Sequence, residues 1–189
     1  IFVYPQALPA GPSAFAWSDP GDAPDELRDY ALFDAIVRRF DAGYCIDRGR
    51  IFAVGHSLGA WFANSLACAR GDVLRAIGTL GGSISPGACR GEVAAILLHN
   101  PEDRLVPVAQ GLSVRDHLLE QNRLRLGGYG IDHAGFRCTR YAFQGTLHPV
   151  LWCAHDRDRT PGGRYYPHQW PGGAGEAIMR FFEALAPLP

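Results

Sequence analysis

The chain has 189 residues, of which 47% are hydrophobic and 20% charged, and its formal net charge at pH 7 is −1. This length and composition are typical of one globular domain, because a single core then buries roughly 70% of the unfolded surface. The scattered charges argue against nucleic acid or an anionic membrane as a partner, and no apolar run approaches the ~20 residues that cross a bilayer. We therefore expect residues 1–189 to form one domain that acts on a neutral small molecule.

The first quarter of the chain predicts a strand, a loop and a helix. Residues 1–4 read as a short buried strand, and a loop rich in Pro and Gly then runs to about Pro24. We interpret this loop as a candidate rim of a site. From Asp25 to Phe40 apolar residues recur at helical spacing, with Arg38 and Arg39 near the end, as the helix dipole favours. These residues predict an amphipathic helix.

The remainder of the chain alternates short apolar strands with helical patterns. We predict strands at 51–54, 74–80, 94–99 and 149–153, and helices at about 58–70, 108–121 and 174–185. Strands that alternate with helices indicate a parallel sheet covered by helices on both faces. The fold class predicted from this order is α/β.

The run Gly55-His56-Ser57-Leu58-Gly59 stands between a predicted strand and a predicted helix. A serine hydroxyl attacks a carbonyl carbon only when it stands clear of the backbone and beside a base. A strained strand–turn–helix presents it in that way, and the glycines leave room where the strand and the helix crowd the turn. We predict Ser57 as a nucleophile, with the backbone N–H of Leu58 facing the developing oxyanion. A structural turn is the alternative interpretation.

The acid of such a site follows the serine along the chain, on a loop beyond a later strand. After the strand that ends at His99, residues 100–107 offer Glu102 and Asp103. We choose Asp103, because it stands just before the Leu-Val-Pro exit of the loop.

Seven histidines compete for the role of the base, which belongs after the last strand. We choose His168, which precedes the final helix in the run Pro167–Pro171, and keep His155 as the alternative. Structural roles are expected for His56, His99 and His117, and no motif surrounds His133 or His148.

Five cysteines stand too far apart for a zinc motif: Cys45, Cys68, Cys89, Cys138 and Cys153. We therefore expect no bound metal. The odd number suggests up to two disulfides with one free thiol, or a partner lost with a missing segment, and oxidised cysteines would favour an exported protein. Buried reduced cysteines are the alternative.

Four parts of the chain together resemble the feruloyl esterase and polyhydroxybutyrate depolymerase-like group, carbohydrate esterase family one: residues 44–47 with 50–59, 99–107, 149–153 and 168–171. The resemblance spans nearly the whole chain. It implies an α/β-hydrolase fold, with a mostly parallel sheet flanked by helices. It also implies a serine esterase, secreted or periplasmic in its full-length parent, with Ser57, Asp103 and His168 as the triad. A disulfide between Cys138 and Cys153, near the base, is a further implication.

The chain departs from the family pattern in three places. Asn100 stands where the family usually has Gly, and Tyr166-Pro167 replaces a Gly-Gly pair before His168. The family also places, upstream of Ile1, a central strand that ends in a His-Gly run and whose loop supplies the other oxyanion donor. We therefore expect an N-terminally incomplete copy that lacks its first strands, with a gap between the strands at Ile1 and Ile51.

The predicted reaction is acyl transfer through an acyl-enzyme, and it needs no cofactor. Feruloyl or related plant cell-wall esters, either small molecules or esters linked to a polysaccharide, are the substrates we expect. Trp17 and Trp170 are the candidate substrate-binding residues of an aromatic cleft. A polyhydroxybutyrate depolymerase-like esterase is the alternative within the class, and a catalytically silent binding module is the alternative outside it.

Overall fold

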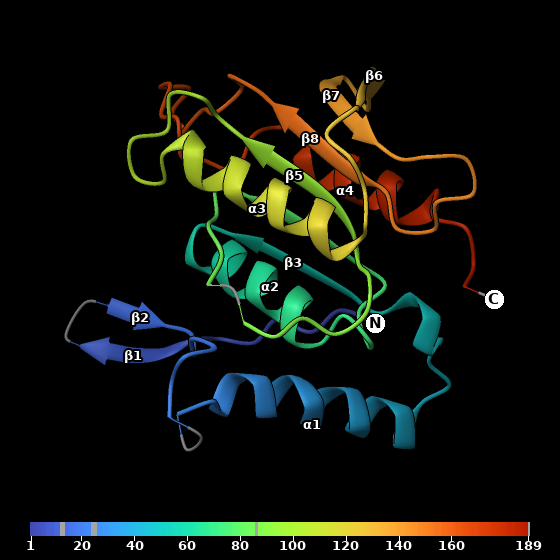
Figure 1. The fold of residues 1–189 in the computed structure, drawn as a ribbon. Coiled ribbons are helices and arrows are strands. Elements are labelled where there is room, and N and C mark those ends of the chain that lie inside the picture. The colour runs from blue at the N-terminus through green and yellow to red at the C-terminus, as the bar shows by residue number, and fades with distance from the viewer. Residues whose placement is uncertain (12–13, 24–25, 86, 189) are drawn as a thin grey trace.

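The computed structural model describes residues 1–11, 14–23, 26–85 and 87–188. Its centre is a six-stranded sheet in the order β3-β4-β5-β8-β7-β6, whose arrows cross the middle of Figure 1. The first four strands of this order run parallel, and β7 and β6 join them as antiparallel neighbours. The strands are β3 (Phe52–His56), β4 (Ala76–Leu80), β5 (Ala94–His99), β6 (Tyr129–His133), β7 (Phe136–Tyr141) and β8 (Val150–Ala154).

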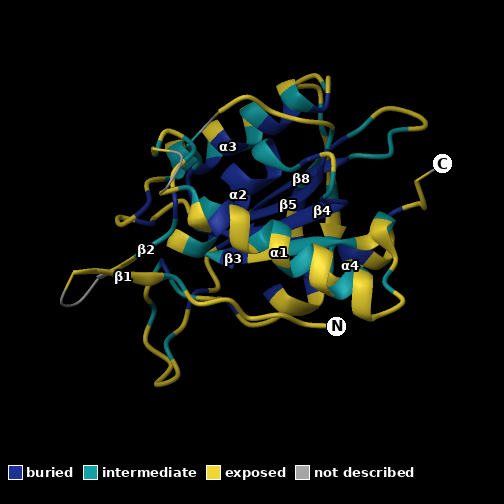
Figure 2. Ribbon diagram, turned by 90° about the horizontal axis from the view of Figure 1, so that it is seen from below, coloured by how far each residue is buried: buried dark blue, intermediate teal, exposed yellow. Residues whose placement is uncertain are grey.

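Helices cover both faces of this sheet. Figure 1 shows α2 and α3 in front of the strands and α4 behind them, and β4, β5 and β8 are the dark, buried strands between the helices of Figure 2. The prediction of a mostly parallel sheet flanked by helices is confirmed. The helices are α1 (Arg28–Gly43), α2 (Leu58–Ala69), α3 (Val108–Gln121) and α4 (Ala174–Glu183), and a short 3-10 helix spans Arg48–Arg50.

The central strand β5 shows how the sequence produces two cores. Successive side chains of a strand point to opposite faces of the sheet. Ile96 and Leu98 accordingly pack in a cluster with the apolar side chains of α4, whereas Ala95 and Leu97 pack in a second cluster with those of α2 and α3. Every residue of β5 is buried, which explains why this strand is continuously apolar rather than alternating.

The predicted strand at residues 1–4 is wrong. Ile1 and Tyr4 are 76% and 87% exposed, and residues 1–7 form no strand. Apolar character alone does not make a strand, because the backbone also needs a neighbour with which to form ladder hydrogen bonds. Within the described residues β3 pairs only with β4 and is therefore an edge strand, and its Val54 is 51% exposed.

The predicted loop and first helix also differ in detail. The loop contains a small antiparallel pair, β1 (Leu8–Gly11) with β2 (Ala14–Ala16). The expected loop end and helix start, Pro24 and Asp25, lie outside the described residues. Helix α1 continues beyond Phe40 to Gly43, so the predicted basic residues 38 and 39 are not in its last turn.

The antiparallel hairpin of β6 and β7 was not predicted from the sequence. Its two-residue turn consists of Ala134 and Gly135, which have φ of 50° and 81°. Two-residue hairpin turns favour such positive φ values, and Asn-Gly or Asp-Gly is their usual sequence signal. Alanine at the first position hides this signal, so the turn goes unrecognised.

Two disulfides hold the described chain together, as the cysteine count suggested. Cys68 pairs with Cys89, and Cys138 pairs with Cys153 across the neighbouring strands β7 and β8. Cys45 is free and exposed. Among the residues that the structure describes, no helix combines the length and the apolar composition that a membrane crossing requires.

Candidate active site

Ser57 occupies the sharp turn between β3 and α2. Its φ and ψ are 55° and −123°, and a positive φ is unusual and strained for a residue other than glycine. Its backbone N–H donates to the carbonyl of Leu80 on β4, with an N–O distance of 3.0 Å. Helix α2 begins at Leu58, so the Leu58 N–H is among the first donors of a helix, which have no acceptor within it.

The two glycines of this turn have different roles. A Cβ added to Gly55 would lie 2.1 Å from the backbone oxygen of Gly59, whereas a Cβ added to Gly59 would meet no atom within 4 Å. Gly55 is therefore required by the close approach of strand and helix. Gly59 contributes its backbone to that approach but does not itself need to lack a side chain.

Replacing Gly55 with alanine is expected to destabilise the fold by more than about 4 kcal/mol, because backbone atoms would have to move. The matched control is Gly59→Ala, which should leave stability unchanged or raise it by up to about 1 kcal/mol through better helix propensity. Urea unfolding monitored by circular dichroism measures both. Equal stability of the two variants would contradict the close approach.

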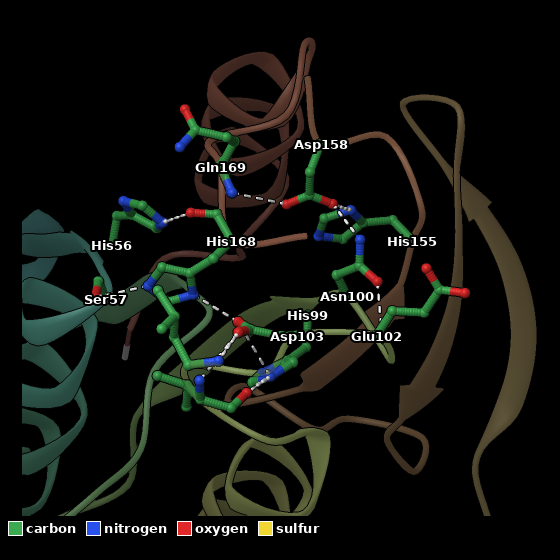
Figure 3. Close-up of polar contacts among 12 residues, drawn as sticks. His56, Ser57, His99, Asn100, Glu102, Asp103, His155, Asp158, His168 and Gln169 are labelled. Carbon is green, nitrogen blue, oxygen red and sulfur yellow. Dashed lines mark hydrogen bonds and ion pairs between the residues drawn. The ribbon is translucent and has the colours of Figure 1, made fainter. Parts of the chain in front are cut away.

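His168 lies between Ser57 and Asp103, as the close-up of Figure 3 shows. Its Nε2 is 2.8 Å from Ser57 Oγ, and its Nδ1 is 2.6 Å from Asp103 Oδ2. Both His168 and Asp103 are buried. The three residues come from distant parts of the chain, and the carboxyl ends of the parallel strands bring them together. The structure thus joins the three residues chosen from the sequence in one hydrogen-bonded line.

The carboxylate of Asp103 is held on both of its oxygens. Oδ1 accepts hydrogen bonds from the backbone N–H groups of Leu105 and Val106, at 2.9 and 3.0 Å, which leaves Oδ2 for His168. On the same turn, His99 Nε2 donates to the carbonyl of Val106 at 2.8 Å. Burial lowers the pKa of His99, so a neutral imidazole supports the turn that carries Asp103.

The alternatives left open by the sequence occupy other positions. Glu102 points away from His168 and accepts a hydrogen bond from the hydroxyl of Tyr165 at 2.9 Å. His155 lies beside Asp158 instead, with 3.1 Å between Nδ1 and Oδ2. Neither residue contacts Ser57 in the described chain.

His56 has a contact that sequence reasoning missed. We expected a structural role beside the nucleophile, but its Nε2 donates to the backbone carbonyl of His168, at 3.1 Å. Burial and the nearby charge of His168 lower the pKa of His56. A neutral His56 therefore ties the turn of the serine to the loop of His168, a contact between residues 112 positions apart that no local motif would reveal.

The two predicted substrate-binding tryptophans lie in different surroundings. Trp170 is 40% exposed, and its ring meets His56 edge to face with 6.3 Å between centroids. Trp17 is partly buried and stacks on Phe62 of α2, with 4.8 Å between centroids. Trp170 is therefore next to the triad, whereas the ring of Trp17 is engaged in packing against α2.

Comparison with known proteins shows which family the chain belongs to. No family model matches the chain. It is 32% identical over 159 residues to "Probable feruloyl esterase C" of Aspergillus terreus and 31% identical over 169 residues to "Feruloyl esterase D" of Neurospora crassa. These alignments cover 82% and 87% of the chain. The chain is a relative of the fungal feruloyl esterases. It spans about half the length of these relatives, 55% of each.

Two solved structures share the fold of this feruloyl esterase relative. An acetyl xylan esterase from Aspergillus awamori superimposes with a TM-score of 0.68 at 11% identity, covering 90% of this chain and 74% of that one. The Bacillus cereus carboxylesterase superimposes with a TM-score of 0.60 at 13% identity, covering 94% and 72%. At such low identity the likeness concerns the fold alone. The chain has the α/β-hydrolase fold, as predicted.

Proposed function

We propose that this chain carries the catalytic domain of a carboxylic ester hydrolase, in which Ser57, His168 and Asp103 form the triad. The observation that carries the proposal is the pair of hydrogen bonds on His168, 2.8 Å to Ser57 Oγ and 2.6 Å to Asp103 Oδ2. Nucleophile, base and orienting acid within hydrogen-bond reach are the signature of an activated serine. The feruloyl esterase relatives support the same class of reaction.

The mechanism that we propose for this site has two steps. His168 Nε2 takes the proton of Ser57 as its oxygen attacks the ester carbonyl, and the carbonyl oxygen becomes an oxyanion that accepts from the Leu58 N–H. Protonated His168 then gives its proton to the departing alcohol, leaving Ser57 acylated. Water repeats the cycle and releases the acid. Asp103 keeps the Nδ1 proton of His168 in place and stabilises the imidazolium.

The substrate we propose is a feruloyl or related cell-wall ester, free or linked to a polysaccharide. The feruloyl esterase relatives support this choice. Trp170 is 40% exposed and lies beside His56, and we propose that its ring packs against an aromatic acyl group next to the triad. Two disulfides support the further proposal that the protein is exported, to the outside or to the periplasm.

The experiment that tests this function compares hydrolysis of methyl ferulate, p-nitrophenyl acetate and hydroxybutyrate oligomers. We expect turnover of the first two, with the higher kcat/KM for methyl ferulate, and Trp170→Ala should raise KM for methyl ferulate more than for the acetate. Preference for the oligomers would favour the depolymerase alternative. No turnover of any of the three, from a folded chain, would favour a silent binding module.

A further inference from the structure

A second polar cluster lies behind the triad, between the loop that carries Asp103 and the loop that carries His168. Its centre is Asp158, whose side chain is 1% exposed. Figure 3 shows Asp158 between Gln169 on one side and Asn100 and His155 on the other. None of these residues contacts Ser57, so the mechanism above does not use them.

Asp158 binds the loop of the base through the residue that follows His168. Its Oδ1 accepts from the backbone N–H of Gln169 at 3.1 Å, and its own carbonyl accepts from the N–H of Tyr166 at 3.2 Å. The backbone on both sides of His168 is therefore attached to one residue. A displacement of the backbone that carries His168 would break these bonds.

The other carboxylate oxygen of Asp158 binds the loop of the acid through Asn100. Asn100 Nδ2 donates to Asp158 Oδ2 at 2.6 Å and to the Tyr165 hydroxyl at 2.9 Å, while Asn100 Oδ1 accepts from the Glu102 N–H at 2.9 Å. The carbonyl of Asn100 also accepts from the N–H of Asp103, at 3.0 Å. The Asn100 carboxamide has both donors and its acceptor engaged, so its orientation is unique.

We propose that Asp158 and Asn100 form a positioning pair that holds His168 at hydrogen-bonding distance from Asp103. This inference rests on the proposed function, since it assigns the pair a role in triad geometry. The contacts join the acid loop and the base loop through the backbone N–H of Asp103 and that of Gln169, which follows His168, and the Asp158 side chain is almost fully buried. Catalysis is sensitive to such geometry, because a displacement of about 1 Å costs on the order of 10²-fold in rate.

The charge of Asp158 suits this role. Burial raises the pKa of its carboxyl, but His155, Asn100 and the Gln169 N–H stabilise the anion more strongly, and the resulting pKa lies below the ordinary value. The pair therefore consists of an ionised acceptor and a neutral donor. Charge-assisted hydrogen bonds of this kind are shorter and stronger than neutral ones, in line with the 2.6 Å between Asn100 Nδ2 and Asp158 Oδ2.

An exchange of the two side chains tests the pair. Asp158→Asn alone places two carboxamides face to face, and Asn100→Asp alone places two carboxylates there. The double variant, Asp158→Asn with Asn100→Asp, restores one donor and one acceptor with the same net charge. The matched control is Asp156→Asn, which removes a carboxylate that is exposed on the same loop.

We expect each single variant to lower kcat for p-nitrophenyl acetate by about 10- to 10²-fold with KM nearly unchanged. The reason is that a misplaced base stabilises the transition state less but leaves substrate binding as it was. The double variant should recover most of the loss, and the control should lose nothing. Thermal unfolding identifies any variant that does not fold, and the kcat values of the folded variants then test the positioning pair. Wild-type kcat in folded single variants, or no recovery in a folded double variant, would overturn the proposal.

A second readout does not depend on turnover. The His168 Nδ1 proton, shared with Asp103 over 2.6 Å, should give a far-downfield proton NMR resonance, assigned by its loss in His168→Gln. We expect each single variant to shift or broaden this resonance, and the double variant to restore it. An unchanged resonance in the single variants overturns the positioning pair. By contrast, absence of hydrolysis by the wild type, with the resonance responding as expected, counts against the proposed function alone.

Discussion

Replacing Ser57 with alanine is expected to lower kcat for p-nitrophenyl acetate by about 10⁶-fold, the loss that removal of the triad serine causes in subtilisin. The variant removes the only atom that the mechanism attaches to the acyl group, and His168 Nε2 loses its partner at 2.8 Å. Steady-state hydrolysis and covalent labelling by a fluorophosphonate measure the effect. Hydrolysis and labelling should disappear together, while the fold is retained.

The control for this variant is Ser113→Ala, an exposed serine on α3. It should leave hydrolysis and labelling at the wild-type level. Hydrolysis that survives in Ser57→Ala would show that the ester is attacked by another group and would remove the basis of the triad. Labelling that survives would show that another serine is activated.

Asp103→Asn should lower kcat by about 10⁴-fold with little change in structure. The backbone N–H groups of Leu105 and Val106 donate to Oδ1, so the new carboxamide will place its oxygen there and turn its NH₂ group toward His168. A donor at this position favours the tautomer in which Nδ1 is the acceptor and Nε2 carries the proton. That imidazole cannot accept a proton from Ser57 at Nε2.

Glu102→Gln is the matched comparison, because Glu102 was the other candidate for the acid. Its side chain is exposed, and a carboxamide oxygen can still accept from Tyr165. We expect kcat within about threefold of the wild type, as for surface substitutions away from the reacting groups. Measurement of kcat for both variants with p-nitrophenyl acetate decides between the two carboxylates. A larger loss of kcat in Glu102→Gln than in Asp103→Asn would identify Glu102 as the acid of the triad.

Much of the fold was readable from local patterns. The strands and the helices that follow them were found because an apolar run of four to seven residues and a helical period of apolar residues are both local signals. The strained turn at Ser57 was found in the same way, since strand, glycine and helix follow one another directly. The hairpin of β6 and β7 was missed because its turn uses Ala134 where the usual signal is Asn, Asp or Gly.

The sequence by itself determined the fold class and the serine turn, because hydrophobic periodicity and turn chemistry act between residues close together in the chain. Only the tertiary structure brought Asp103 and His168, rather than Glu102 and His155, into one hydrogen-bonded line with Ser57. Glu102 is exposed and Asp103 is buried, whereas both histidines are buried and differ in the direction of their rings. The tertiary structure alone showed that residues 1–4 have no strand partner among the described residues and that Asp158 and Asn100 join the loops of His168 and Asp103. Hydrogen bonds between residues 58 positions apart depend on how the strands are ordered in the sheet, and no local pattern carries that information.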